Sequence, residues 1–214
     1  VSNILSKMGV RDRTRAVLKA FEEEYGVTVE VTTFNNMEEG IQKLVAGQVQ
    51  ADVFFPTTDY VSRLVEGDLL QPVNHELIPN LEANYWKVFS DPGPYYDLGW
   101  RYTVPYVIYT TGVGYRRDVI DDAAAAAAGY ELFFDPQFKD AVSYYDSYRD
   151  ALGMMLLRDG ADVNSDDAAA ITAAKDAILQ MINDNGARLT INGAYAKLPE
   201  GEFSVAEAWS GDIV

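Results

Sequence analysis

The 214-residue sequence contains no cysteine and a single histidine, His75. Without cysteine there are no disulfide bonds, thiolate metal sites or cysteine nucleophile. A catalytic triad or a histidine-based metal site would have to use His75, which follows Asn74 in a turn-like stretch and is better interpreted as a surface residue. No nucleophile–base pair and no phosphate-binding loop is visible. We therefore expect no enzymatic activity, no metal and no cofactor.

Long apolar runs and positive charge are also scarce. No run of eighteen apolar residues is present, so no membrane-spanning helix is predicted, and the first ten residues show no signal-peptide pattern. The 33 acidic residues outnumber the 17 basic ones, which gives a net charge of −16. This disfavours nucleic-acid binding, because phosphate contacts need a basic face. An acidic cleft would attract a cationic ligand, although solubility or adaptation to high salt explains the charge more simply.

Helical and strand patterns alternate in the first half of the chain. We expect helices at 14–25, 36–46 and 57–65, and strands at 27–33 and 52–55. Such βα alternation predicts a mostly parallel sheet with helices on its faces. The stretch 69–100 contains four of the eight prolines and is expected to be irregular.

The segment WRYTVPYVIYTTGVGY at 100–115 is rich in residues that favour strands. We expect strands at 102–105 and 107–115, and we interpret the segment as a crossover between two lobes, 1–108 and 109–214. In the second lobe the sequence predicts strands at 141–145 and 203–209 and helices at 147–158 and 166–183. No segment returning to the first lobe is visible after them.

Six consecutive alanines occupy positions 123–128. Alanine has the highest helix propensity, but this run includes no apolar or charged side chain that would anchor a helix. Either the run forms a helix, or the alanines stand for side chains that were not identified. Both interpretations remain open.

Polar and aromatic residues follow the expected strands. Ligands of open α/β sheets bind beside the carboxyl ends of the strands, and three of four such ends carry carboxylates. Each hydrogen bond from an ammonium group to a carboxylate contributes about 1.5–3 kcal/mol, and an aromatic face adds about 0.5–2 kcal/mol. The strand ends therefore suit an organic cation. They comprise residues 57–60, Tyr106, residues 146–150 and residues 210–212.

These residues also have structural interpretations that involve no ligand. Polar residues at 57–59 and at 146–147 could cap the helices that follow them. Arg149 could pair with a neighbouring carboxylate, and Asp150 could be an ordinary surface residue. Trp209 could belong to the core, as aromatic residues at strand ends often do.

Four segments in order carry a family resemblance that extends from about residue 17 to residue 214. They are ADVFFPTTDYVSRLVEGDLLQPV, YTVPYVIYTTGVGYRRD, FFDPQFKDAVSYYDSYRDALG and FSVAEAWSGDIV. Together they resemble the bacterial spermidine/putrescine-binding proteins, the periplasmic or surface-anchored substrate-binding subunits of ABC importers. The resemblance implies an α/β fold of two hinged lobes that close on a polyamine. It also implies a permease partner, a location in the periplasm or on the extracellular face of the membrane, and a monomer.

The resemblance implies ligand contacts from both lobes. In the first lobe Thr57 matches a ligand-contacting Ser or Thr, and Asp59 stands where an aromatic residue is common.

In the second lobe Asp150 matches the acid after an Arg. Ser147 stands where Asp is common, and Asp146 could compensate for that change. Trp209 matches a tryptophan that stacks on the methylenes of the polyamine, and Asp212 matches an acid that some members use on the terminal amine.

The sequence departs from the family at both ends. Only VSNILSKMGVRD precedes the first expected helix, so the family's first strand and its aromatic loop are expected to be missing. Members also continue well past the turn that WSGD matches. We therefore expect a fold that is incomplete at both ends and that binds ligand weakly or not at all.

Two other functions remain open. The acids near Asp146 and Asp59 could serve a hydrolase. The same fold could also bind another solute, such as a sugar, an anion or iron. Anion binding would need more basic residues than Arg149, and iron would use the tyrosines at 144, 145 and 148.

Overall fold

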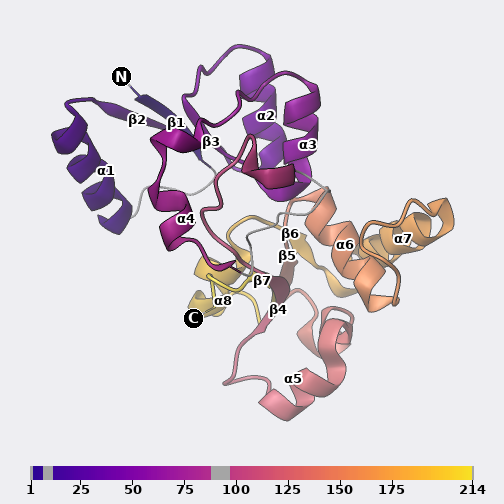
Figure 1. Cartoon of the computed structure of the whole chain (residues 1–214). Coiled ribbons are helices and arrows are strands. Elements are labelled where there is room, and N and C mark those ends of the chain that lie inside the picture. Colours follow the sequence, from indigo (N-terminus) through magenta and orange to yellow (C-terminus); the bar gives the residue numbers. More distant parts are fainter. Residues whose placement is uncertain (1, 7–11, 88–96, 214) are drawn as a thin grey trace. The chain divides into compact units, whose positions relative to one another are not determined.

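The computed structural model describes residues 2–6, 12–87 and 97–213. The chain forms two compact units, Val1–Val107 and Ile108–Val214 (Figure 1), called unit 1 and unit 2 below. Each unit contains one sheet and several helices. The α/β class predicted from the sequence is thereby confirmed for both.

Unit 1 contains a three-stranded parallel sheet with the strand order β2-β1-β3. The strands are β1 (Ser2–Ser6), β2 (Val29–Thr33) and β3 (Val53–Phe55). The expectation that the first strand is missing is wrong, because β1 is the central strand. Its sequence SNILS has only two apolar residues and therefore a weak local signal. Pairing with a neighbour on each side stabilises it instead.

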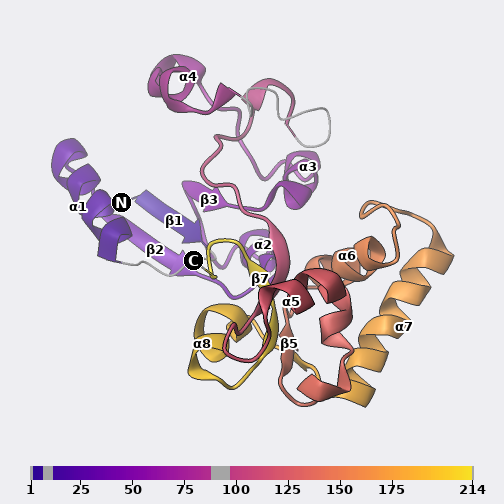
Figure 2. The same cartoon turned by 90° about the horizontal axis from the view of Figure 1, so that it is seen from below.

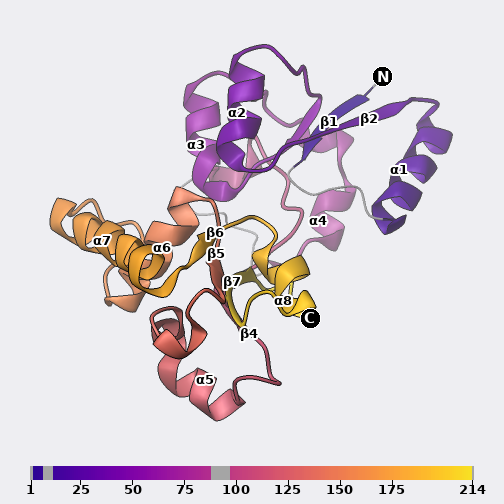
Figure 3. The ribbon, with the colours of Figure 1, turned by 180° about the vertical axis from the view of Figure 1, so that it is seen from behind.

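The described residues of unit 1 include the helices α1 (Asp12–Tyr25), α2 (Met37–Val45), α3 (Thr58–Glu66) and α4 (Asn80–Asn84). A short 3₁₀ turn, His75–Leu77, precedes α4. The Asn36 side chain caps α2 by accepting the N–H of Glu39. The helices α2 and α3 (Figure 3) contribute Met37 and Tyr60 to a small core that also contains Phe34. Partly buried apolar residues pack against these three, namely Ile41, Leu44, Ala51 and Phe54.

The strand expected at 102–105 is wrong, and the strand expected at 107–115 is shorter than predicted. A further 3₁₀ turn, Leu98–Trp100, lies just before this stretch. The buried carboxylate of Asp97 accepts the N–H groups of Tyr102 and Thr103 at 2.9 and 2.7 Å, and the Thr103 hydroxyl at 2.6 Å. These backbone donors bind a side chain instead of a neighbouring strand. Regular pairing begins only at Thr111.

Unit 2 contains a mixed four-stranded sheet with the order β4-β7-β5-β6. The strands are β4 (Thr111–Tyr115), β5 (Val142–Tyr144), β6 (Arg188–Leu189) and β7 (Val205–Trp209). The strands β7, β5 and β6 are parallel, whereas β4 runs antiparallel to β7. The sheet is therefore mostly parallel, with β4 as an antiparallel edge strand.

The helices of unit 2 are α5 (Asp122–Ala128), α6 (Tyr148–Arg158), α7 (Ala168–Asn185) and the short α8 (Leu198–Glu200). The alanine run forms α5, whose N-terminus is capped by Asp121. The helices α6 and α7 pack side by side (Figure 2). Short helical turns at Gly129–Phe133, Pro136–Phe138 and Gly193–Lys197 complete the unit.

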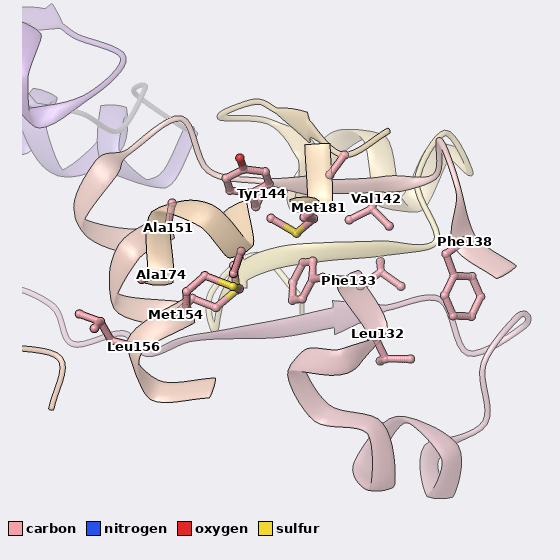
Figure 4. Close-up of a cluster of buried hydrophobic side chains, with 14 of the residues drawn as sticks. Leu132, Phe133, Phe138, Val142, Tyr144, Ala151, Met154, Leu156, Ala174 and Met181 are labelled. Atoms are coloured by element: carbon pink, nitrogen blue, oxygen red, sulfur yellow. The ribbon is translucent and has the colours of Figure 1, made fainter. Parts of the chain in front are cut away.

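The core of unit 2 joins helices and sheet. Figure 4 shows Phe133, Val142 and Met181 among the side chains that meet there, and each of the three has 0% exposure. Buried Asn185 ties the end of α7 to the turn after Phe133 by donating to the carbonyls of Phe133 and Asp135. This packing holds β5 and β7, whose ends carry the candidate site, in fixed positions.

Gly186, just after α7, provides a test of this packing. Its φ is +64°, and a Cβ there would clash with Oδ1 of Asp140. We expect Gly186→Ala to lower the free energy of unfolding by about 2–3 kcal/mol, from left-handed strain plus the clash. Gly160→Ala is the matched control, because Gly160 has φ +73° but no atom near its Cβ position. It should cost only about 1 kcal/mol. Equal losses in urea unfolding would contradict the contact with Asp140.

Candidate functional site

The candidate site of unit 2 lies where two adjacent strands end. The strands β5 and β7 are parallel neighbours, so the residues that follow them emerge at the same edge of the sheet. Tyr145, Asp146 and Ser147 follow β5, and Asp212 follows Trp209 at the end of β7. The topology thus brings together two segments more than sixty residues apart in sequence.

Tyr145 connects these two segments. Its ring stacks on that of Trp209, with centroids 4.1 Å apart and an interplanar angle of 24°. The backbone N–H of Trp209 donates to the Tyr145 hydroxyl at 3.0 Å, and that hydroxyl donates to Oδ2 of Asp212 at 2.9 Å. Burial strongly raises the pKa of the Tyr145 phenol. The phenol therefore stays neutral and acts as both acceptor and donor.

Two further residues surround Trp209. The Tyr109 ring lies 5.7 Å from it at an angle of 58°. Thr111 is the register partner of Trp209 across β4 and β7, and its hydroxyl donates to Oδ1 of Asp150 at 3.4 Å. The structure therefore brings Asp150, Trp209 and Asp212 to one edge of the sheet. Trp209 is only partly buried, so the interpretation as a plain core residue does not describe it.

Asp146 and Ser147 flank this group. Asp146 is exposed, and Ser147 occupies the N-cap position of α6. The Ser147 side chain makes no capping hydrogen bond, so the interpretation of its hydroxyl as a helix cap is wrong.

Thr57 and Asp59 belong to unit 1. Thr57 occupies the N-cap position of α3 without a side-chain capping bond, and its backbone N–H donates to Sδ of Met37 at 3.4 Å. Asp59 is exposed in the first turn of α3. Nearby at the end of β3, the rings of Phe55 and Tyr106 meet edge to face at 4.9 Å. The convergence of Thr57 and Asp59 with the residues of unit 2 stays a prediction.

Sequence reasoning missed Glu207, a buried carboxyl in the middle of β7. It is 1% exposed, and its Oε2 accepts the N–H of Tyr145 at 2.9 Å. Burial raises the pKa of the Glu207 carboxyl to about 8, and the negative charge of Asp150 also acts in this direction. The available signal was a single acid inside an otherwise apolar strand, VAEAW. Tyr145 and Tyr109 were missed as ring partners of Trp209.

Groups of acidic residues and the single histidine can be compared with the metal-site and triad alternatives. Within the part of the chain that the structure describes, no three His, Cys, Asp or Glu side chains are grouped so that they could hold a metal ion. Nε2 of His75 lies 2.7 Å from the carbonyl oxygen of Trp100 and forms a hydrogen bond with it.

In residues 2–6, 12–87 and 97–213, no helix has the length and apolar character needed to cross a bilayer.

The fold is that of the periplasmic-binding proteins. A solved structure from Listeria monocytogenes, described as a spermidine/putrescine ABC transporter, superposes with a TM-score of 0.85 at 24% identity. The alignment covers 99% of this chain and 63% of that one. At this level of identity the similarity establishes the fold.

Sequence comparison identifies the family. The pattern of the family described as bacterial extracellular solute-binding protein matches residues 16–214, and the chain belongs to this family. It is a family of binding proteins, not of enzymes.

The curated relatives refine this assignment. The putrescine/cadaverine-binding protein of Pseudomonas aeruginosa is 29% identical over 92% of this chain and 55% of its own length. The putrescine-binding periplasmic protein PotF of Escherichia coli is 25% identical over 90% of this chain and 54% of its own length. The resemblance to spermidine/putrescine-binding proteins is thus confirmed. The chain spans about half the length of these relatives.

The raised pKa of Glu207 predicts a pH-dependent stability. Between the ordinary value of 4.5 and about 8, folded Glu207 keeps a proton that the unfolded chain releases. The free energy of unfolding should therefore fall as pH rises through this window, by up to about 1.4 kcal/mol per pH unit from this group. Glu207→Gln keeps an acceptor for Tyr145 but does not titrate, so its profile from pH 5.5 to 7.5 should lack this slope. Parallel urea-unfolding profiles would contradict the assignment.

The bridging role of Tyr145 predicts a second effect. Tyr145→Phe keeps the ring stack but removes both hydrogen bonds of the hydroxyl, and we expect a loss of about 1–3 kcal/mol in unfolding free energy. Amide hydrogen exchange at Trp209 should also accelerate. Tyr195→Phe is the control, because Tyr195 is 48% exposed. If Tyr145→Phe, like Tyr195→Phe, changes neither the unfolding free energy nor the exchange at Trp209, the bridging role of Tyr145 is contradicted.

Proposed function

We propose that this protein is an extracytoplasmic solute-binding subunit that captures a polyamine, putrescine or spermidine, and delivers it to an ABC importer. Family membership provides the class, and the names of the curated relatives indicate the solute. The observation that carries the proposal is the grouping of two carboxylates, Asp150 and Asp212, beside the partly buried ring of Trp209.

This grouping suits the chemistry of a polyamine. A protonated amine donates up to three hydrogen bonds, and ionised carboxylates are its strongest acceptors. The methylene spacer between two amines is apolar and packs on an aromatic face, while a cation near that face gains about 0.5–2 kcal/mol. Trp209, held by the Tyr145 stack, would lie along the spacer, and Asp150 and Asp212 would bind amines.

The remaining predicted contacts complete the proposal. Asp146 and Ser147 would add polar contacts at the same edge, and Thr57 and Asp59 would contribute from unit 1 when two lobes close around the ligand. The partner would be the permease of the importer, and the protein would act as a monomer in the periplasm or on the extracellular face of the membrane. The net charge of −16 would favour the capture of a cation.

Calorimetric titration with putrescine and spermidine tests the proposal. We expect weak but saturable binding by the wild-type protein, since the chain spans about half the length of its curated relatives. It should weaken about tenfold in Trp209→Ala, which loses the aromatic face, and about 10- to 100-fold in Asp150→Asn, which loses a charged acceptor. Asp176→Asn is the control, because Asp176 is an exposed acid of α7 that pairs with Lys175. If the wild-type protein gives no binding heat with either polyamine, the proposal is overturned.

A further inference from the structure

Unit 2 contains a cavity of about 140 Å³, open to solvent on one side, between α6 and the strands β4 and β7. Most of its wall is apolar or lacks a side chain, with Gly112, Gly153, Met154 and Val163 among the lining residues. An apolar cavity of about 150 Å³ accepts a ligand of six carbon atoms. This cavity therefore has room for a short alkyl chain.

Glu207 forms part of the wall and has an unsatisfied acceptor. Its Oε2 accepts the Tyr145 N–H, whereas its Oε1 is fully buried and has no hydrogen-bond partner among the described residues. Buried polar atoms are nearly always hydrogen-bonded, because an unmade bond is costly. When Glu207 is ionised, this oxygen can accept a hydrogen bond from a donor that enters the cavity.

The charges around the cavity define that donor. The other charged wall residues are Arg149 and Asp150 on α6, whose charges are opposite. An ionised Glu207 would leave the wall with a net charge of −1, which one monovalent cation neutralises. A cation that also fills apolar space has an alkyl chain, and one that satisfies both carboxylates has several N–H groups.

We infer that this cavity is a subsite for one primary alkylammonium group, which donates hydrogen bonds to Glu207 and Asp150 while its methylenes contact the apolar wall. This inference rests on the proposed function, because a polyamine is a solute that supplies such a group. It adds Glu207 to the residues that would recognise the solute.

Binding at this subsite is linked to a proton. The titratable and charged groups that face Glu207 are Asp150 and Arg149 on α6 and Tyr144 and Tyr145 at the end of β5. Because burial raises the pKa of Glu207 to about 8, the carboxyl is mostly neutral at pH 6.5. An ammonium group favours the ionised carboxylate, so binding at pH 6.5 should release about one proton.

The experiment is calorimetric titration of the protein with putrescine and, separately, with propylammonium chloride at pH 6.5 and 8.5. Both amines stay cationic in this range, since alkylamines resemble lysine in pKa. Wild-type affinity should rise about 25-fold from pH 6.5 to 8.5, as follows from a group with a pKa of about 8. Buffers of different ionisation enthalpy should reveal the released proton at pH 6.5.

Two variants test separately the carboxylate of the subsite and the free volume of its cavity. Glu207→Gln should bind at least about tenfold more weakly than wild type at pH 8.5, with no rise between the two pH values and no proton release. Val163→Phe should weaken binding by filling the cavity while it keeps the pH dependence. Glu200→Gln changes an exposed glutamate that pairs with Lys197 and should behave as wild type.

The outcomes distinguish the subsite from the proposed function. Binding of putrescine with no proton release and no effect of Glu207→Gln overturns the subsite and leaves the proposed function standing. Binding of propylammonium through Glu207, with neither putrescine nor spermidine bound, supports the subsite and overturns the polyamine assignment. Failure of all three amines to bind overturns both. Should Glu207→Gln not fold, proton release by the wild-type protein decides the question.

Discussion

The side chain and backbone of Tyr145 hold together the edge of unit 2 on which the candidate site depends. The backbone N–H binds Glu207, the hydroxyl bonds to both the Trp209 N–H and Asp212, and the ring stacks on Trp209. Because Tyr145 is 1% exposed, these bonds are shielded from competing water. The residue thus orients an aromatic face and a carboxylate before any ligand arrives, which reduces the entropy lost on binding.

Four carboxyl groups lie at this edge of the sheet and differ in their exposure to solvent. Asp146 is exposed, Asp150 and Asp212 are partly buried, and Glu207 is buried. Burial, with a smaller contribution from the charge of Asp150, raises the pKa of Glu207, so the most buried carboxyl retains its proton near neutral pH. Such an arrangement stabilises the folded protein less at high pH but increases its attraction for a cation, a compromise often found at binding sites.

Much of the architecture followed from local patterns. The helices α1, α2, α3, α6 and α7 were predicted within a few residues. So were the strands at Val29–Thr33, Val53–Phe55, Val142–Tyr144 and Val205–Trp209. The weak strand β1 and the short β6 were missed, because neighbouring strands stabilise them more than their own sequences do. A strand was wrongly predicted at 102–105, where the buried Asp97 captures the backbone donors.

The sequence by itself determined the α/β class, the family resemblance and the residue types at the strand ends, because periodicity and short motifs are local properties of the chain. Only the tertiary structure decided that Tyr145 joins Trp209 to Asp212 and that Glu207 is buried beside Asp150. These relations depend on the parallel pairing of β5 with β7. Pairing between strands more than sixty residues apart results from packing of the whole unit, which leaves no local signal in the sequence.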